Sequence, residues 1–125
     1  MIDLLKGDEE AVKKSEELDK ETELFTTEIN VFEILYGIFR DKSINREREL
    51  QSASKLFHKL NILPLKGEAT IKSAEIAGGL TQKGLTIDPH DCITAGISLA
   101  NGISTVVTRN KGHYQRINGM NVETY

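Results

Sequence analysis

Three carboxylates are the residues of this chain whose surroundings best suit chemistry: Glu33, Asp88 and Asp91. Glu33 is the single charged residue between Val31 and Phe39, so apolar side chains surround it on any helix over this segment. We therefore expect no turn of that helix to face solvent fully, and we expect Glu33 to be at least partly buried. A buried carboxylate is costly unless a proton, a basic partner or a metal ion compensates its charge. The alternative is a Glu at the solvent edge or paired with a nearby Lys.

Asp88 and Asp91 lie at the start of an expected helix that has Pro89 at its first position. Asp88 is a good N-cap residue, and Asp91 can reach back to the free amides from the third helical position. Capping therefore explains both residues without chemistry. The preceding residues 85–87 indicate a strand, and ligands gather beyond the carboxyl ends of parallel strands. Capping and metal binding are compatible, so both interpretations stay open.

A further polar segment, Thr108 to Asn110, directly follows the β-branched stretch 103–107. That stretch indicates a buried strand, which would end at the same edge of the sheet as Asp91. Arg109 and Lys111 add positive charge there, as does Arg116. Small polar residues are also common at strand ends for purely structural reasons.

Other reactive residues have weaker support. We expect His58 on a helix surface and Cys92 in the core. His90 and His113 fall near the expected edge, but neither has a partner at a metal-binding spacing. The sequence has no glycine-rich phosphate loop, no GxSxG turn and no Cys/His pair, which leaves phosphate cradling and acyl transfer without support.

The remaining candidate is a site of oxygen ligands made from Glu33, Asp91 and Asp88. Carboxylates are the ligands that Mg²⁺ and Mn²⁺ prefer. Two such ions can activate water and stabilise the leaving oxygen when a phosphodiester bond is cleaved. One face of the protein can still meet phosphates, because residues 40–66 carry seven basic and three acidic residues although the whole chain has a net charge of −3.

Length and composition limit the number of domains, the kinds of site and the location that this chain can have. A chain of 125 residues predicts one domain over 1–125. Its single cysteine excludes an internal disulfide and a structural zinc site. No apolar run is long enough to span a membrane, and the N-terminus lacks the features of a signal peptide, so we expect no membrane association and a cytoplasmic location.

The elements that must position the site alternate between helices and strands. The pattern predicts helices near residues 8–18, 29–39, 46–60, 67–83 and 89–101, and strands near 61–65, 85–87, 103–107 and 121–125. Residues 24–26 are either a brief strand or an extended lead-in, and Thr26 or Thr27 caps the following helix. We expect the helix over 67–83 to bury Ile71, Ala74 and either Ala77 or Gly78. Strands separated by helices predict an α/β fold with a mainly parallel sheet covered on both faces.

Three motifs in this order resemble the PIN-domain ribonucleases of the VapC toxin type: residues 26–33 (TTEINVFE), 91–95 (DCITA) and 107–119 (VTRNKGHYQRING). The likeness covers nearly the whole chain. It implies an α/β/α sandwich with a mainly parallel central sheet and Mg²⁺- or Mn²⁺-dependent cleavage of RNA. It also implies a homodimer and inhibition by a cognate antitoxin.

The resemblance assigns roles position by position. It implies that Glu33 and Asp91 bind metal and take part in catalysis, while Asp88 has no firm counterpart and its metal role rests on the residues alone. Asn110 falls where many relatives carry a fourth acidic residue or Asn, and with Thr108 it is expected to orient water or ligand groups. The substrate-binding residues implied here are Asn30, Arg109 and Lys111.

Residues 1–7 resemble the segment that follows the first strand of this family and its leading aspartate. We therefore expect that strand and that aspartate just upstream of Met1, and we interpret the chain as N-terminally truncated. Asp3 matches a later helical position and is not expected to replace the aspartate. Loss of that carboxylate is expected to weaken metal binding by at least roughly 10- to 100-fold.

Two other functions remain open on the sequence. A PIN-like interaction protein without catalytic activity would bind an antitoxin or a second copy of itself. A nuclease acting on DNA or on structured flaps would use the same carboxylates. Cleavage of RNA and DNA compared side by side separates the second from a ribonuclease.

Overall fold

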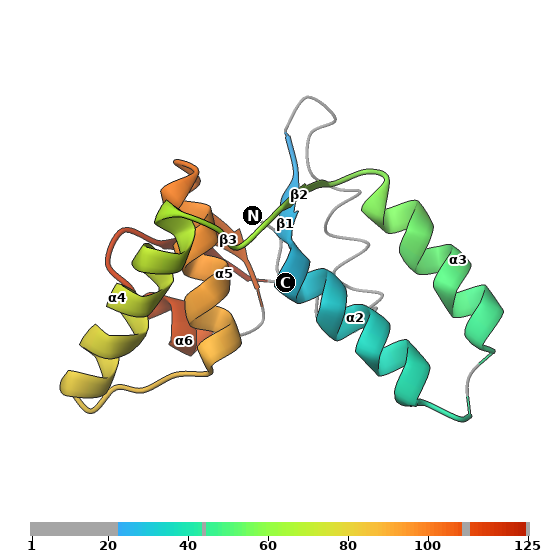
Figure 1. Cartoon of the computed structure of the whole chain (residues 1–125), viewed down its shortest axis with the longest axis horizontal. Coiled ribbons are helices and arrows are strands. Elements are labelled where there is room, and N and C mark those ends of the chain that lie inside the picture. Colours follow the sequence, from blue (N-terminus) through green and yellow to red (C-terminus); the bar gives the residue numbers. More distant parts are fainter. Residues whose placement is uncertain (1–22, 44, 109–110, 125) are drawn as a thin grey trace.

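The computed structural model describes residues 23–43, 45–108 and 111–124. Its elements follow in the order β1 (Phe25–Thr27), α2 (Glu28–Arg40), α3 (Arg46–Phe57), β2 (Asn61–Leu63), α4 (Glu68–Gln82), α5 (Pro89–Ala100), β3 (Thr105–Val107), α6 (Lys111–Gln115) and β4 (Asn121–Glu123). In Figure 1, α2 and α3 form a hairpin on one side, and α4, α5 and α6 gather on the other. The predicted helix near 8–18 lies outside the described residues.

The strands pair in parallel, as the alternation of helices and strands predicted. Strand β1 pairs with β2, with Thr26 opposite Ile62. Strand β3 pairs with β4, with Val106 opposite Val122. Within the described ranges these pairs are two separate two-stranded sheets. The α/β fold class with parallel strands is confirmed, and the brief strand before α2 is real.

Helix ends lie close to their predicted positions because the capping residues are local signals. Thr27 caps α2 by accepting a hydrogen bond from the amide of Asn30 at 3.1 Å. Asp88 caps α5, with Pro89 as its first residue. Gly102 follows that helix at a φ of 73°, a conformation that glycine adopts without strain. None of the helices in the described ranges is long and apolar enough to cross a membrane.

Helices α2 and α3 pack through one apolar cluster. Ile34 and Ile38 of α2 meet Ala53 and Leu56 of α3, and Leu60 completes the contact just after α3 ends. The helix predicted near 46–60 thus packs its apolar residues on the middle and the last turn of α2.

The predicted buried face of α4 is wrong for Ile71 and Ala74, whereas Ala77 is partly buried against the core as predicted. Ile71 is 55% exposed and Ala74 is exposed, whereas Ala69, Ser73 and Leu80 are buried. The physical reason is close packing against α5. A Cβ atom placed on Gly96 would lie 2.6 Å from Cα of Ser73, so α4 can approach α5 only with a small residue at this position. Close approach of the two helices at Ser73 and Gly96 therefore contributes to the choice of the buried face of α4, together with the apolar contacts of Leu80.

The predicted strand over 85–87 is also wrong, since these residues form no regular structure. Their carbonyl groups have a different partner: Nη1 of Arg116 lies 3.4 Å from the carbonyl of Leu85 and 3.5 Å from that of Thr86. The amide of Leu85 donates to the carbonyl of Leu80 and closes the end of α4. Asp91 therefore opens a helix after a loop and not after a strand.

Helix α2 has an exposed aromatic side, which contradicts the expectation that no turn of it faces solvent. We call Phe32, Tyr36 and Phe39 the aromatic face of α2; they are 59%, 54% and 52% exposed. The rings of Phe32 and Tyr36 stack with their centroids 6.0 Å apart. Glu33 itself is half-buried, as expected.

Candidate metal and nuclease site

Asn30 joins the two helices that carry the candidate site. It is 2% exposed and lies in the first turn of α2. Its Nδ2 donates to Oγ1 of Thr26 at 3.4 Å, and its Oδ1 accepts from Oγ1 of Thr94 on α5 at 3.4 Å. Both ends of this buried amide are therefore paired, and the contact fixes the start of α2 against α5. The predicted contact of Asn30 with substrate stays a prediction.

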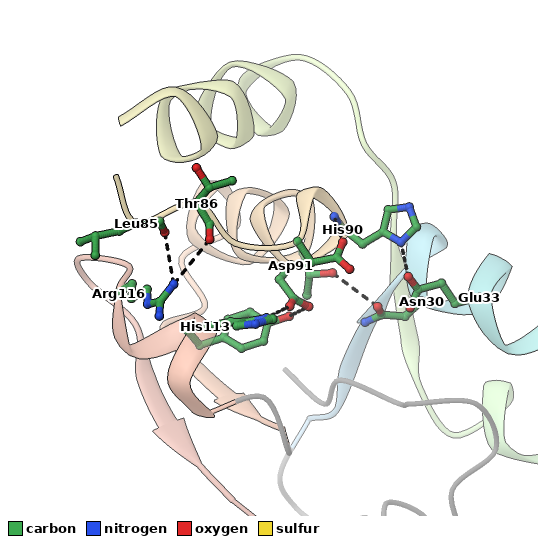
Figure 2. A network of polar contacts seen from close by, with 11 residues as sticks. Asn30, Glu33, Leu85, Thr86, His90, Asp91, His113 and Arg116 are labelled. Carbon is green, nitrogen blue, oxygen red and sulfur yellow. Dashed lines mark hydrogen bonds and ion pairs between the residues drawn. The ribbon is translucent and has the colours of Figure 1, made fainter. Parts of the chain in front are cut away.

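Glu33 lies one turn further along α2 and faces the start of α5. Its Oε1 is hydrogen-bonded to Nδ1 of His90, the residue before Asp91 (Figure 2). The side chain of Glu33 is 23% exposed and that of His90 is 47% exposed. Segments far apart in the sequence thus bring Glu33 and Asp91 to the same region of the molecule.

Asp91 is buried and is held from the opposite side by α6. Nδ1 of His113 lies 2.6 Å from its Oδ2, and the hydroxyl of Tyr114 donates to its Oδ1 at 3.1 Å. Asp91 is 7% exposed and Tyr114 is fully buried. The side chain of Asp91 therefore turns toward α6 and does not make the capping contact that its third helical position allowed.

Asp88 acts as the expected cap. Its Oδ1 accepts from the amide of His90 at 2.9 Å, and the residue is exposed. This contact uses one oxygen and leaves the second free of any described contact. A metal role for Asp88 remains a proposal beside this observed structural role.

Two of the remaining predicted residues, Thr108 and Lys111, are described by the structure. Thr108 is fully buried, and its amide donates to the carbonyl of Glu123 at 2.9 Å. Lys111 is exposed at the first position of α6. Arg109 and Asn110 lie outside the described residues.

The sequence interpretation gave no role to His90, His113 and Tyr114, although the structure places all three on the candidate carboxylates. Metal-binding spacing does not reveal them, because each histidine contacts a candidate carboxylate that lies far away in the sequence. Position in the sequence was the available signal: His90 precedes Asp91, and His113 and Tyr114 lie within the third motif, residues 107–119. The other histidine behaves as expected, since His58 is exposed and its Nδ1 lies 2.7 Å from the carbonyl of Ser54.

Cys92 is 2% exposed and belongs to the core, as predicted. Burial raises the pKa of its thiol, and the nearby charges of Asp91 and Asp88 raise that pKa further. A thiol in this setting stays protonated at neutral pH and is a poor nucleophile.

The chemistry of the donors fits a small, hard cation. Glu33 and Asp91 supply carboxylate oxygens, the ligand type preferred by Mg²⁺ and Mn²⁺. In the part of the chain that the structure describes, no three Asp, Glu, His or Cys side chains gather closely enough to hold an ion together. Two carboxylates from facing helices are thus the core of the candidate site, and water and substrate oxygens usually complete the coordination of Mg²⁺.

Comparison with known proteins agrees with this arrangement. The family model described as PIN domain matches residues 1–119. The tRNA(fMet)-specific endonuclease VapC of Salmonella typhimurium is 31% identical over 97 residues, which are 78% of this chain and 71% of that protein.

Solved structures give the same result. A DNA-bound VapBC from Salmonella typhimurium has a TM-score of 0.70 at 31% identity and covers 78% of this chain and 72% of that one. VapBC2 from Rickettsia felis, bound to a DNA fragment from its promoter, has a TM-score of 0.82 at 24% identity and covers 100% of this chain and 99% of that one, which supports the fold alone. The family match, the shared fold and the meeting of Glu33 with the start of α5 lead to one conclusion: this chain belongs to the PIN-domain family.

Proposed function

We propose that this protein is a divalent-metal-dependent endoribonuclease of the toxin type, which hydrolyses phosphodiester bonds of RNA in the cytoplasm. The observation that carries the proposal is the placement of Glu33 on α2 beside the start of α5, where Asp91 lies. A relative at 31% identity that bears the name of an endonuclease supports it.

Each candidate residue has its own proposed role. Glu33 and Asp91 hold Mg²⁺ or Mn²⁺, with Asp88 as a further carboxylate at the edge of the site. When bound, the metal supplies activation of water and stabilisation of charge on the phosphate oxygens. Asn30 keeps the two helices in register through its contact with Thr94.

The groups around the end of β3 act on the substrate. Thr108 and Asn110 orient water or ligand groups, and Asn30 helps to bind the substrate. Arg109 and Lys111 contact RNA phosphates; the exposed position of Lys111 at the start of α6 suits this role. Because the relative from Salmonella typhimurium is named for tRNA(fMet), a transfer RNA is the first substrate to test.

We further propose that a small antitoxin binds this protein and that the protein forms a homodimer. The similar structures from Salmonella typhimurium and Rickettsia felis are VapBC complexes, which supports an antitoxin partner. The aromatic face of α2 offers it a surface beside Glu33. Arg40 lies 5.3 Å from the ring centre of Tyr36, and Arg46 lies 5.6 Å from that of Phe39, so a segment with apolar and acidic residues complements this face.

The test is cleavage of RNA with Mn²⁺ by the native protein and by Glu33→Gln and Asp91→Asn. We expect each substitution to lower the rate by at least about 100-fold, since a lost metal ligand costs more than the roughly 10- to 100-fold of an outer partner. Glu75→Gln is the matched control, because Glu75 is an exposed carboxylate on α4. Equal activity of all four proteins would remove Glu33 and Asp91 from the mechanism.

A binding protein without catalysis is the second candidate. The observation in its favour is that His90 and His113 already pair with both candidate ligands, while a large aromatic face on α2 is exposed. Antitoxin binding without any Mn²⁺-stimulated cleavage of RNA or DNA would support it. Cleavage of DNA in preference to RNA would instead point to a DNA nuclease.

A further inference from the structure

Both oxygens of the Asp91 carboxylate have a hydrogen-bond partner on α6. Oδ2 lies 2.6 Å from Nδ1 of His113, and Oδ1 accepts from the hydroxyl of Tyr114 at 3.1 Å. The two partners are consecutive residues of one short helix, Lys111–Gln115. Figure 2 shows His113 approaching Asp91 from the side opposite to Asn30 and Glu33.

Two such contacts determine where a carboxylate points. One donor on a single oxygen leaves the group free to rotate about its terminal torsion, which is broad for Asp. A donor on each oxygen fixes that torsion as well. Because Tyr114 is fully buried in the core that also contains Ala95 and Val106, its hydroxyl is itself held in place.

These contacts orient the carboxylate without blocking it. An ionised carboxylate has about four lone-pair sites on its two oxygens, and the two donors use one site on each oxygen. A site on each oxygen therefore remains for a cation. Hydrogen bonds to a charged acceptor are also stronger than those between neutral groups.

Glu33 differs in this respect. Among the described residues its carboxylate has a hydrogen bond from one side chain, His90, and the side chain of His90 is 47% exposed. The carboxylate of Glu33 can therefore reorient when an ion binds, whereas the carboxylate of Asp91 already has a fixed orientation.

We propose that Tyr114 and His113 are positioning residues that preset the Asp91 carboxylate for a divalent cation. The inference rests on the proposed function, since it takes Asp91 as a metal ligand. Neither residue needs to touch the metal. Partners of this kind typically change metal affinity by roughly 10- to 100-fold.

The first test is the affinity for Mn²⁺ alone, measured by titration calorimetry on the folded protein in the absence of RNA. Tyr114→Phe removes only the hydroxyl, and we expect it to weaken Mn²⁺ binding by about 10-fold. Ser52→Ala is the matched control, because it also removes a single hydroxyl group and Ser52 is exposed on α3. We expect that variant to bind Mn²⁺ as the parent protein does.

The second test uses the identity of the bonded atom. The contact is made by Nδ1 of His113, and the side-chain amide nitrogen of Asn occupies a similar position, whereas that of Gln lies further out. We expect His113→Asn to keep Mn²⁺ affinity within about 3-fold and His113→Ala to lose about 10-fold. A role in folding alone would lower the melting temperature without separating Asn from Ala in metal affinity, and that result would overturn the inference.

Asp91→Asn separates failure of this inference from failure of the proposed function. If Asp91→Asn binds Mn²⁺ like the parent protein, the proposed metal site is wrong, and the inference is overturned with it. If Asp91→Asn loses binding while Tyr114→Phe and His113→Ala keep it, only the positioning role is overturned. Loss of binding in all three, with His113→Asn retaining it, supports both.

Discussion

At the scale of single residues, the candidate site depends on side chains that find partners far away in the sequence. Glu33 was selected from the sequence by its apolar surroundings. Asp91 was selected by its place at the start of a helix and by the family resemblance, although the strand expected before it is a loop. Their partners were not predictable in the same way, because His113 on α6 reaches Asp91 on α5, 22 residues earlier in the sequence. Nothing local to a histidine shows which carboxylate it will meet.

Cys92 gives a prediction at this scale. Burial raises the pKa of its thiol above the usual value of 9.0, so the folded protein keeps the protonated form at neutral pH. We expect iodoacetamide to modify Cys92 slowly in the folded protein and rapidly in urea, as followed by mass spectrometry. Equal rates in both conditions would contradict the buried position.

The same pKa shift predicts how stability depends on pH. The folded state binds the thiol proton more tightly than the unfolded state does. The resulting contribution to stability is fully present below the pKa of the unfolded chain and is lost as the pH rises through the higher folded pKa. Urea titrations of the parent protein and of Cys92→Ala between pH 7 and about pH 10 check this, since the parent should lose more stability over that interval.

At the scale of elements, helices with a cap and a clear apolar stripe were predictable. The start of α5 follows from Asp88 and Pro89, and its end follows from Gly102, because the effects of these residues are local. The face of α4 and the segment 85–87 were not predictable, because each depends on a contact with another element. For α4 that contact is with α5, and for 85–87 it is with Arg116.

The packing of α4 on α5 predicts opposite effects for two helical glycines. Gly96→Ala forces a methyl group against the backbone of Ser73, and we expect it to lower the free energy of unfolding by about 3 kcal/mol. Gly78→Ala meets no atom within 4 Å, and we expect it to raise that free energy by about 0.5–1 kcal/mol, the usual gain in a helix. Urea denaturation followed by circular dichroism measures both. A stable Gly96→Ala protein would show that α4 and α5 are further apart.

At the scale of the whole molecule, the parallel pairing and the meeting of α2 with α5 were expected from the alternation of elements and from the family resemblance. The aromatic face of α2 was not expected, because apolar residues around Glu33 indicated burial on all sides. A face exposed in an isolated chain but composed like a core is typical of a surface that binds a partner.

This face predicts a defined loss of partner binding. We expect Tyr36→Ala combined with Phe39→Ala to weaken binding of the proposed antitoxin by at least about 30-fold, as for interface residues that dominate affinity. Ile71→Ala is the matched control, because Ile71 is 55% exposed on α4. Titration calorimetry distinguishes the variants, and equal affinities would place the antitoxin elsewhere.

Glu33 and Asp91 are proposed to hold a common divalent cation. Crystals soaked in Mn²⁺ and measured at the manganese absorption edge test it most directly. We expect an anomalous peak between the two side chains, within about 2.0–2.3 Å of a carboxylate oxygen of each. A peak that contacts neither carboxylate, at a Mn²⁺ concentration that supports cleavage, would contradict the account.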